Sequence, residues 1–330
     1  MSQLSQQPAS RPAPNFIQRH FPRLYAFWKF SRPHTVIGTS LSALSLWLIA
    51  LVESGQWQTN GPVALSPALP ALLWAWFACL CGNIYIVGLN QIEDVAIDRV
   101  NKPHLPLASG EFSLGTGWAI VLLTGAVALG ISAWQGPFLM ATVWVSLLIG
   151  TAYSLPPVRL KRFPVWAALC IFSVRGAIVN LGLFLHFNRQ FGGPGFGGSA
   201  QIPATIWALT LFILVFTFAI AIFKDIPDLE GDRRYQISTF TIRLGAEAVF
   251  KLARAVITVC YGGMILAGLL LPGVNPLVLV TSQAILLGLM WWRSTQVNLQ
   301  DKAEVARFYQ FIWKLFFLEY LLFPIACLMS

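Results

Sequence analysis

Residues 203–232 read PATIWALTLFILVFTFAIAIFKDIPDLEGD, and this stretch decides the fold. Its first part is an apolar run long enough to cross the hydrocarbon core of a bilayer, which takes about 20 residues. Its last part carries acidic residues at 225, 228, 230 and 232, directly after the apolar run ends. The stretch therefore predicts a transmembrane helix with a cluster of carboxylates at one of its ends.

Eight further apolar runs predict an all-α, polytopic bundle of about nine transmembrane helices. The nine candidate spans are about 35–52, 71–90, 115–134, 137–153, 165–187, 203–224, 245–270, 274–292 and 308–328. The composition agrees, because 56% of the residues are hydrophobic and 11% are charged, whereas soluble domains carry about a quarter charged residues. We expect one membrane domain over residues 31–330, preceded by a polar, flexible segment over residues 1–30 that carries neither a secretory signal nor a transit peptide.

The basic residues are distributed unevenly between the two sides of the predicted bundle. Seventeen of the 22 lysines and arginines fall on the side of the N-terminus, and one, Arg189, falls on the other. The positive-inside rule places the N-terminus and the acidic clusters in the cytoplasm. The net charge of +9 then reflects contact with anionic lipid and anionic substrate rather than with nucleic acid, and no obligate protein partner is evident.

The acidic residues gather in two windows on that same side. Seven of the 13 aspartates and glutamates lie in Glu93–Asp98 and Asp225–Asp232, each directly after a predicted span. Clustered carboxylates repel one another unless a cation is bound between them. A pair of solvated helix ends is the alternative interpretation.

Within each window the oxygen-bearing residues fall on one helix face. They stand at i, i+4 and i+8 in the first window and at i, i+3 and i+7 in the second, as Asn90, Asp94 and Asp98, and as Asp225, Asp228 and Asp232. Two such faces opposite one another suit Mg²⁺, which binds one or two carboxylates and completes its shell with water and phosphate. The five aspartates are therefore predicted as catalytic metal ligands, with Asn90 as a neutral oxygen donor.

Basic and hydroxyl side chains accompany the acids, as the grip on a diphosphate requires. A third loop on the same side, residues 153–162, is also basic. The predicted substrate-binding residues of the three regions, beside Asn90, are Arg99, Lys102, Tyr153, Ser154, Lys161 and Lys224.

Arg175 is the basic residue that stands out within a span. It lies about ten residues into the fifth predicted span, near mid-membrane, where a charge is costly and usually functional. One hypothesis is that it binds a carboxylate of the substrate or pairs with an acid of the windows. The alternative is a structural contact with a helix carbonyl or with Glu247.

The first window, NQIEDVAID over residues 90–98, resembles the NxxxDxxxD loop of the UbiA superfamily of intramembrane prenyltransferases, and KDIPDLEGD over 224–232 resembles its second Asp-rich loop. The resemblance covers essentially the whole chain after residue 25. Further stretches are similar to homogentisate prenyltransferases, in particular to the type that transfers a phytyl group in tocopherol synthesis. These stretches are SRPHT (31–35), NKPHLPLASG (101–110), VRGAIVNLG (174–182) and FIWKLFF (311–317).

The resemblance implies Mg²⁺-dependent transfer of a prenyl group, phytyl favoured, from its diphosphate to the ring of homogentisate, with loss of diphosphate and CO₂. It implies the nine-helix fold, with the Asp-rich loops capping a central cavity on the cytoplasmic side, and, without a transit peptide, a cyanobacterial thylakoid or plasma membrane. Many relatives have an aromatic residue before the first aspartate and an acid two residues after it, where this chain has Glu93 and Ala96. Alternatives are a geranylgeranyl or solanesyl donor, a chlorophyllide or 4-hydroxybenzoate acceptor, and, from another class, a membrane transporter.

Overall fold

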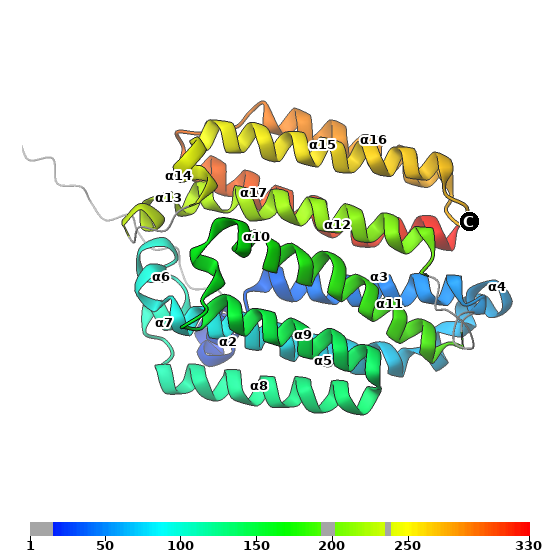
Figure 1. Ribbon diagram of the computed structural model, residues 1–330, viewed down its shortest axis with the longest axis horizontal. Helices are drawn as coiled ribbons and strands as arrows, with labels where there is room; N and C mark the ends of the chain where they lie inside the picture. Colours follow the sequence, from blue (N-terminus) through cyan, green and yellow to red (C-terminus); the bar gives the residue numbers. More distant parts are fainter. Residues whose placement is uncertain (1–15, 193–201, 235–238) are drawn as a thin grey trace, which may run out of the picture.

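The computed structural model describes residues 16–192, 202–234 and 239–330, and every regular element within these ranges is a helix (Figure 1). The long helices are α3 (Pro33–Glu53), α5 (Leu65–Glu93), α8 (Leu114–Gln135), α9 (Pro137–Ser154), α12 (Ala204–Phe223), α15 (Ala246–Leu270), α16 (Pro276–Ser294) and α17 (Lys302–Leu328). One more long rod has three parts: α10 (Pro164–Phe172), the π-helical turn η3 (Ser173–Ile178) and α11 (Val179–Gln190). The short helices are α1 (Phe16–His20), α2 (Pro22–Phe30), α4 (Gln56–Asn60), η1 (Gly61–Ala64), α6 (Val95–Asn101), α7 (Pro106–Ser109), η2 (Leu160–Arg162), α13 (Asp225–Arg234) and α14 (Phe240–Leu244).

The predicted all-α membrane fold is confirmed. Within the described residues, nine helical stretches are long and apolar enough to cross a membrane, and they coincide with the nine runs in the sequence. The second stretch is longer than expected, because helix continues through Gln56–Glu93. The outer surface is apolar as well: Leu123 on α8, Leu148 on α9 and Val259 on α15 are more than 60% exposed, as side chains that face lipid are.

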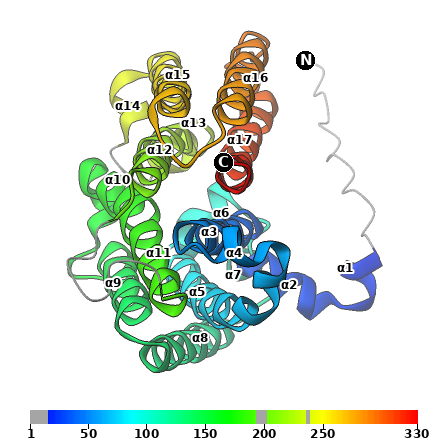
Figure 2. The same ribbon diagram turned by 90° about the vertical axis from the view of Figure 1, so that its right-hand side faces the viewer.

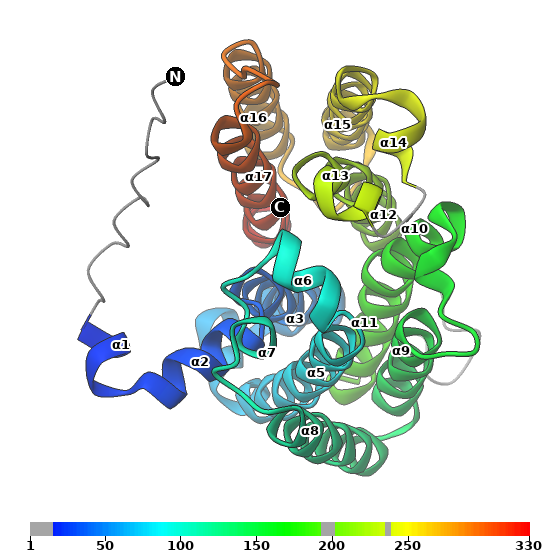
Figure 3. The ribbon, with the colours of Figure 1, turned by 90° about the vertical axis from the view of Figure 1, so that its left-hand side faces the viewer.

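The long helices run side by side, and the short helices α6, α7, α13 and α14 gather at one end of the bundle (Figures 1 and 3). Helix α3 lies inside the bundle and packs against α5, α11 and α17. Figure 2 shows α8 on the outside of α5, and α15 and α16 on the far side beyond α12 and α17. The sequence folds this way because each apolar run must satisfy its own backbone hydrogen bonds inside a membrane.

Local signals fix where the helices begin. Proline occupies the first turn of α3, α9, α10 and α16, where its missing N–H leaves no hydrogen bond unmade. Ser113 accepts a hydrogen bond from the Thr116 backbone N–H at the start of α8, and Asp301 accepts from Ala303 and Glu304 at the start of α17.

The segment expected to be polar and flexible, residues 1–30, includes the helices α1 and α2. Residues 1–15 lie outside the described ranges. Phe30, the last residue of α2, is fully buried, and its carbonyl accepts a hydrogen bond of 2.7 Å from Gln91 Nε2 on α5. The end of α2 is therefore attached to the bundle just before α3 begins.

The π-helical turn η3 crosses α12 at very close range. A Cβ atom placed on Gly176 would lie 2.6 Å from the Cα atom of Leu214. Asn180 Nδ2 donates a hydrogen bond of 2.8 Å to the Gly176 carbonyl, and the Tyr320 hydroxyl donates one of 3.0 Å to Asn180 Oδ1. The turn is therefore held between α12 and α17.

We expect Gly176→Ala to destabilise the protein by about 1–3 kcal/mol, because the added methyl group forces two helix backbones apart. The measurement is the midpoint of thermal unfolding of the purified protein in detergent. Gly130→Ala on α8 is the matched control, since nothing lies within 4 Å of a Cβ atom there. Equal midpoints for the two variants would contradict the close crossing.

Candidate active site

A cavity of about 1610 Å³ begins between the short helices at the end of the bundle and continues inward between the long ones. Both acidic windows and the basic loop after α9 contribute to its lining. Along α3 it extends from Arg32 to Ser42, so it reaches from the predicted membrane surface toward the middle of the bundle.

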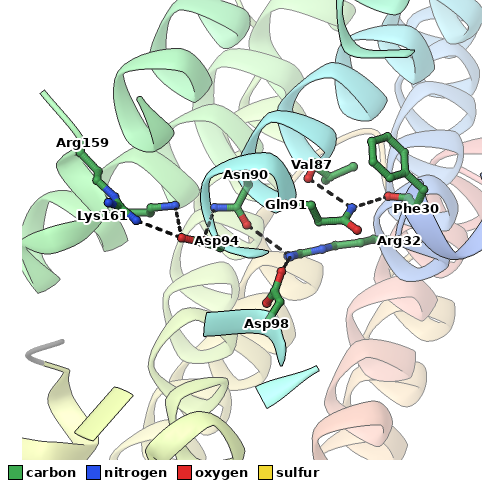
Figure 4. Close-up of polar contacts among 9 residues, drawn as sticks. All are labelled: Phe30, Arg32, Val87, Asn90, Gln91, Asp94, Asp98, Arg159 and Lys161. Atoms are coloured by element: carbon green, nitrogen blue, oxygen red, sulfur yellow. Dashed lines mark hydrogen bonds and ion pairs between the residues drawn. The ribbon is translucent and has the colours of Figure 1, made fainter. Parts of the chain in front are cut away.

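Asp94 marks a break in the helix at the first window, since α5 ends at Glu93 and α6 begins at Val95. The backbone hydrogen bonds nevertheless continue, from Asp94 N to Asn90 O at 3.0 Å and from Asp98 N to Asp94 O at 2.7 Å. The three oxygen-bearing residues therefore remain one turn apart, and Figure 4 shows Asn90 and Asp94 adjacent to each other.

Two cations of the third loop bind Asp94 (Figure 4). The Lys161 Nζ atom lies 2.7 Å from Asp94 Oδ1, and Arg159 Nη2 donates to the same oxygen at 3.2 Å. Asn90 Nδ2 donates to Asp94 Oδ2 at 3.1 Å. This carboxylate thus joins α5 to the loop between α9 and α10.

Arg32, at the start of α3, contacts the rest of the first window. Its Nη2 donates to Asn90 Oδ1 at 3.2 Å and lies 3.9 Å from Asp98 Oδ2. Asp98 is buried, with 5% of its surface exposed. In the sequence, Arg32 and Arg159 were interpreted only as basic residues of the cytoplasmic side. Neither was predicted to be a site residue.

A backbone signal distinguishes these two arginines. Among the described non-glycine residues, Arg32 and Arg159 are the two with positive φ, at 52° and 37°. This backbone conformation is strained for a residue with a Cβ atom, and residues that adopt it are concentrated at functional sites. The contacts with Asp94, Asn90 and Asp98 keep both residues in it.

The second window faces the first, because α13 packs against α6. Asp225 is 9% exposed and lines the cavity, and Lys224 Nζ lies 4.0 Å from Asp225 Oδ1. Asp228 and Asp232 belong to α13, but their side chains lie outside the described part of the structure.

Most of the other predicted site residues also line the cavity. Those with described side chains that do so are Asn90, Asp94, Asp98, Lys102, Tyr153, Lys161, Arg175, Lys224 and Asp225. Arg99 and Ser154 are not among the lining residues. Each follows a lining residue by one position on a helix, so its side chain points about 100° away around the axis: Arg99 is exposed, and Ser154 is fully buried.

The mouth of the cavity is electropositive, and burial and nearby charges shift the pKa values of its titratable groups. Burial lowers the pKa of His104, in the loop between α6 and α7, and the charges of Lys29, Lys102 and Arg32 lower it further. Burial also lowers the pKa of Lys161, while Asp94 acts in the opposite direction. His104 is therefore neutral near pH 7, and the charge at the mouth comes from the lysines and arginines.

The donor set fits a hard divalent cation that is shared with a ligand. Among the described residues, no three His, Cys, Asp or Glu side chains form a metal cage by themselves. Asp94, Asp98 and Asp225 instead present carboxylate oxygens to one cavity from two directions. This arrangement suits Mg²⁺, which relies on few protein ligands and on phosphate.

Comparisons with known proteins show which family the chain resembles. The model of the UbiA prenyltransferase family matches residues 58–315. Homogentisate phytyltransferase from Synechocystis sp. is 53% identical over 305 residues, which are 92% of this chain and 96% of that one. Homogentisate phytyltransferase 1 of Arabidopsis thaliana is 42% identical over 306 residues, which are 91% of this chain and 75% of that one.

The fold is also similar to a solved structure. A UbiA homolog from Archaeoglobus fulgidus bound to GPP and Mg²⁺ superposes with a TM-score of 0.62 at 16% identity, covering 92% of this chain and 100% of that one. At this level of identity the similarity extends to the fold alone.

We expect Arg32→Met to weaken the binding of magnesium pyrophosphate by about 10- to 100-fold, since hydrogen bonds of a charged group contribute about 1.5–3 kcal/mol. Isothermal titration of the purified protein measures the effect. Arg307→Met is the control, because its side chain is 59% exposed and pairs with Glu304 on the same helix. An unchanged dissociation constant for Arg32→Met would show that Arg32 does not contact the bound pyrophosphate.

Proposed function

This chain belongs to the UbiA prenyltransferase family, and on that premise we propose that it transfers a phytyl group from phytyl diphosphate to the aromatic ring of homogentisate. Diphosphate and CO₂ are lost, and the product is a methyl-phytyl-benzoquinol, a precursor of tocopherol. The observation that carries the proposal is the 53% identity to a homogentisate phytyltransferase over nearly the whole of both chains. The cavity supplies the chemistry that such a reaction requires.

The mouth of the cavity is the donor end. Asp94, Asp98, Asp225, Asp228 and Asp232 would hold Mg²⁺, with Asn90 as an additional oxygen donor. Bound there, Mg²⁺ would neutralise the diphosphate and make it a better leaving group.

Around these acids, cationic side chains stabilise the charge that moves onto the diphosphate oxygens. Arg32, Arg159 and Lys161 already lie against the first window, and Lys102 and Lys224 line the same cavity. Fixed positive charge of this kind lowers the barrier most when it is in place before the bond breaks.

Deeper in the cavity, the protein must protect an allylic cation from water. Apolar side chains predominate there, and Trp313, which lines the cavity beside His34, can stabilise positive charge by cation–π contact. As the C–O bond to diphosphate breaks, the electron-rich ring of the acceptor forms a C–C bond to the allylic carbon and then loses a proton. Loss of CO₂ from the acetate arm leaves a methylene carbon, which takes up a proton to become the methyl group.

The membrane setting follows from the same features. The protein is an integral, multi-pass membrane protein. We place the cavity mouth in the cytoplasm, because the arginines and lysines concentrate at that end, and we place the protein in a thylakoid or plasma membrane. A transporter, the alternative from another class, would not release pyrophosphate from a prenyl diphosphate.

Purified protein in detergent should form methyl-phytyl-benzoquinol from homogentisate and phytyl diphosphate when Mg²⁺ is present. Mass spectrometry identifies the product, and geranylgeranyl and solanesyl diphosphates test the donor. Excess EDTA should abolish turnover, because the clustered carboxylates need a divalent cation to hold diphosphate. Full turnover in EDTA, or no turnover with any of the three donors, would overturn the proposal.

Asp98→Asn should lower kcat by about 100-fold or more. The substitution removes a buried negative charge from the carboxylates that would hold Mg²⁺, and fixed charges of this kind stabilise the transition state. Glu247→Gln is the control, since its side chain is 73% exposed and pairs with Lys251 away from the cavity. Steady-state release of pyrophosphate measures both variants. A kcat for Asp98→Asn equal to that of the control would contradict the catalytic role.

A further inference from the structure

Arg175 carries a positive charge inside the bundle, and no described acidic side chain lies beside it. Arg175 lines the cavity, and its guanidinium lies over two aromatic rings, 5.3 Å from the centre of Trp313 and 5.7 Å from that of Phe316. Among the described residues no hydrogen-bond or ion-pair partner contacts it, and Glu247, the acid considered from sequence, pairs with Lys251 at 2.7 Å. Buried charges are normally paired, so the guanidinium lacks an anion that a ligand could bring.

The surrounding structure fixes the position of this guanidinium. Arg175 belongs to the π-helical turn η3, which Asn180 and Tyr320 hold through the Gly176 carbonyl. Turns of this type occur frequently at functional sites within helices. On its other side the guanidinium touches α3, where a Cβ atom on Gly38 would lie 2.8 Å from Arg175 Nη1.

Helix α3 shows how deep Arg175 lies. Gly38 follows Arg32 by six residues, so the guanidinium is about 9 Å further along the helix than the arginine that contacts Asn90 and Asp98. His34 lies between these two levels, and its ring centre is 4.9 Å from that of Trp313. The distance between the two levels is enough for one aromatic ring.

Neither the diphosphate nor the prenyl tail of the donor suits the position beside Arg175. The diphosphate belongs with the acids and cations at the mouth, one level away. A prenyl tail against Arg175 would leave a charge buried in hydrocarbon, which is very costly. A carboxylate, by contrast, can accept two parallel hydrogen bonds from a guanidinium.

We propose that Arg175 binds the carboxylate of the aromatic acceptor, and that Trp313 and Gly38 are positioning residues that hold its guanidinium in place. The inference rests on the proposed function, and it names the chemical class of the acceptor: an aromatic ring that carries an acid group. The ring then lies between Arg175 and the diphosphate, at the level of His34 and Trp313.

The test compares homogentisate with its methyl ester, which lacks the negative charge, in wild type and in Arg175→Met. Release of pyrophosphate reports turnover with either acceptor. Arg175→Met should raise KM for homogentisate by about 30-fold or more, as the loss of one partner of a buried charge pair does. KM for phytyl diphosphate should stay within about threefold, and the wild-type preference for homogentisate over the ester should disappear.

Gly38→Ala probes the same site without removing the charge. The added methyl group displaces the guanidinium, so KM for homogentisate should rise while KM for phytyl diphosphate does not. Alanine favours the helix, so this variant keeps the test available if Arg175→Met does not fold. Gly130→Ala, which has no neighbour within 4 Å of its Cβ position, should behave as wild type.

The outcomes separate this inference from the proposed function. If wild type turns over homogentisate but the variants keep its KM and the preference over the ester, the acceptor site is wrong and the proposed function stands. A rise in KM for phytyl diphosphate alone would assign Arg175 to the donor and equally overturn the inference. A wild type that turns over neither acceptor would contradict the proposed function itself.

Discussion

Carboxylates that face one another at the end of this bundle stay together because arginine and lysine side chains lie among them. Asp94 is paired with Lys161 and Arg159, and Asp98 lies beside Arg32. Without these cations the first window would repel the second, which approaches it from α13. The two arginines can contact phosphate while they are paired, because a guanidinium has five N–H donors.

Three parts of the chain that are distant in sequence deliver these groups. Arg32 comes from the turn before α3, Asp94 and Asp98 from the junction of α5 and α6, and Arg159 and Lys161 from the loop after α9. The positive φ values of Arg32 and Arg159 indicate that tertiary contacts, rather than local preference, set the backbone there. The hydrogen bond from Gln91 to the Phe30 carbonyl fixes the chain two residues before Arg32 and so helps to aim it.

The cavity is organised in levels along α3. Acids and cations occupy the mouth, His34 and Trp313 form an aromatic level, and Arg175 lies beyond them against Gly38. Charged side chains therefore line the described cavity at two separated levels, its mouth and Arg175. A substrate pair with a diphosphate on one molecule and a carboxylate on the other matches these two positions.

The sequence by itself determined the nine spans, the end of the bundle at which charge gathers and the family motifs, because hydrophobic runs and i, i+4 spacing are local properties of the chain. Asn90, Asp94 and Asp98 could be assigned to one face for that reason. Only the tertiary structure decided that Arg32 and Arg159 contact this face, since these contacts join residues 58 and 65 positions apart. It likewise decided that Arg99 and Ser154 point away from the cavity. It also decided that Arg175 sits in a π-helical turn with no anion beside it among the described residues, because the close crossing of Gly176 over α12 depends on how the helices pack.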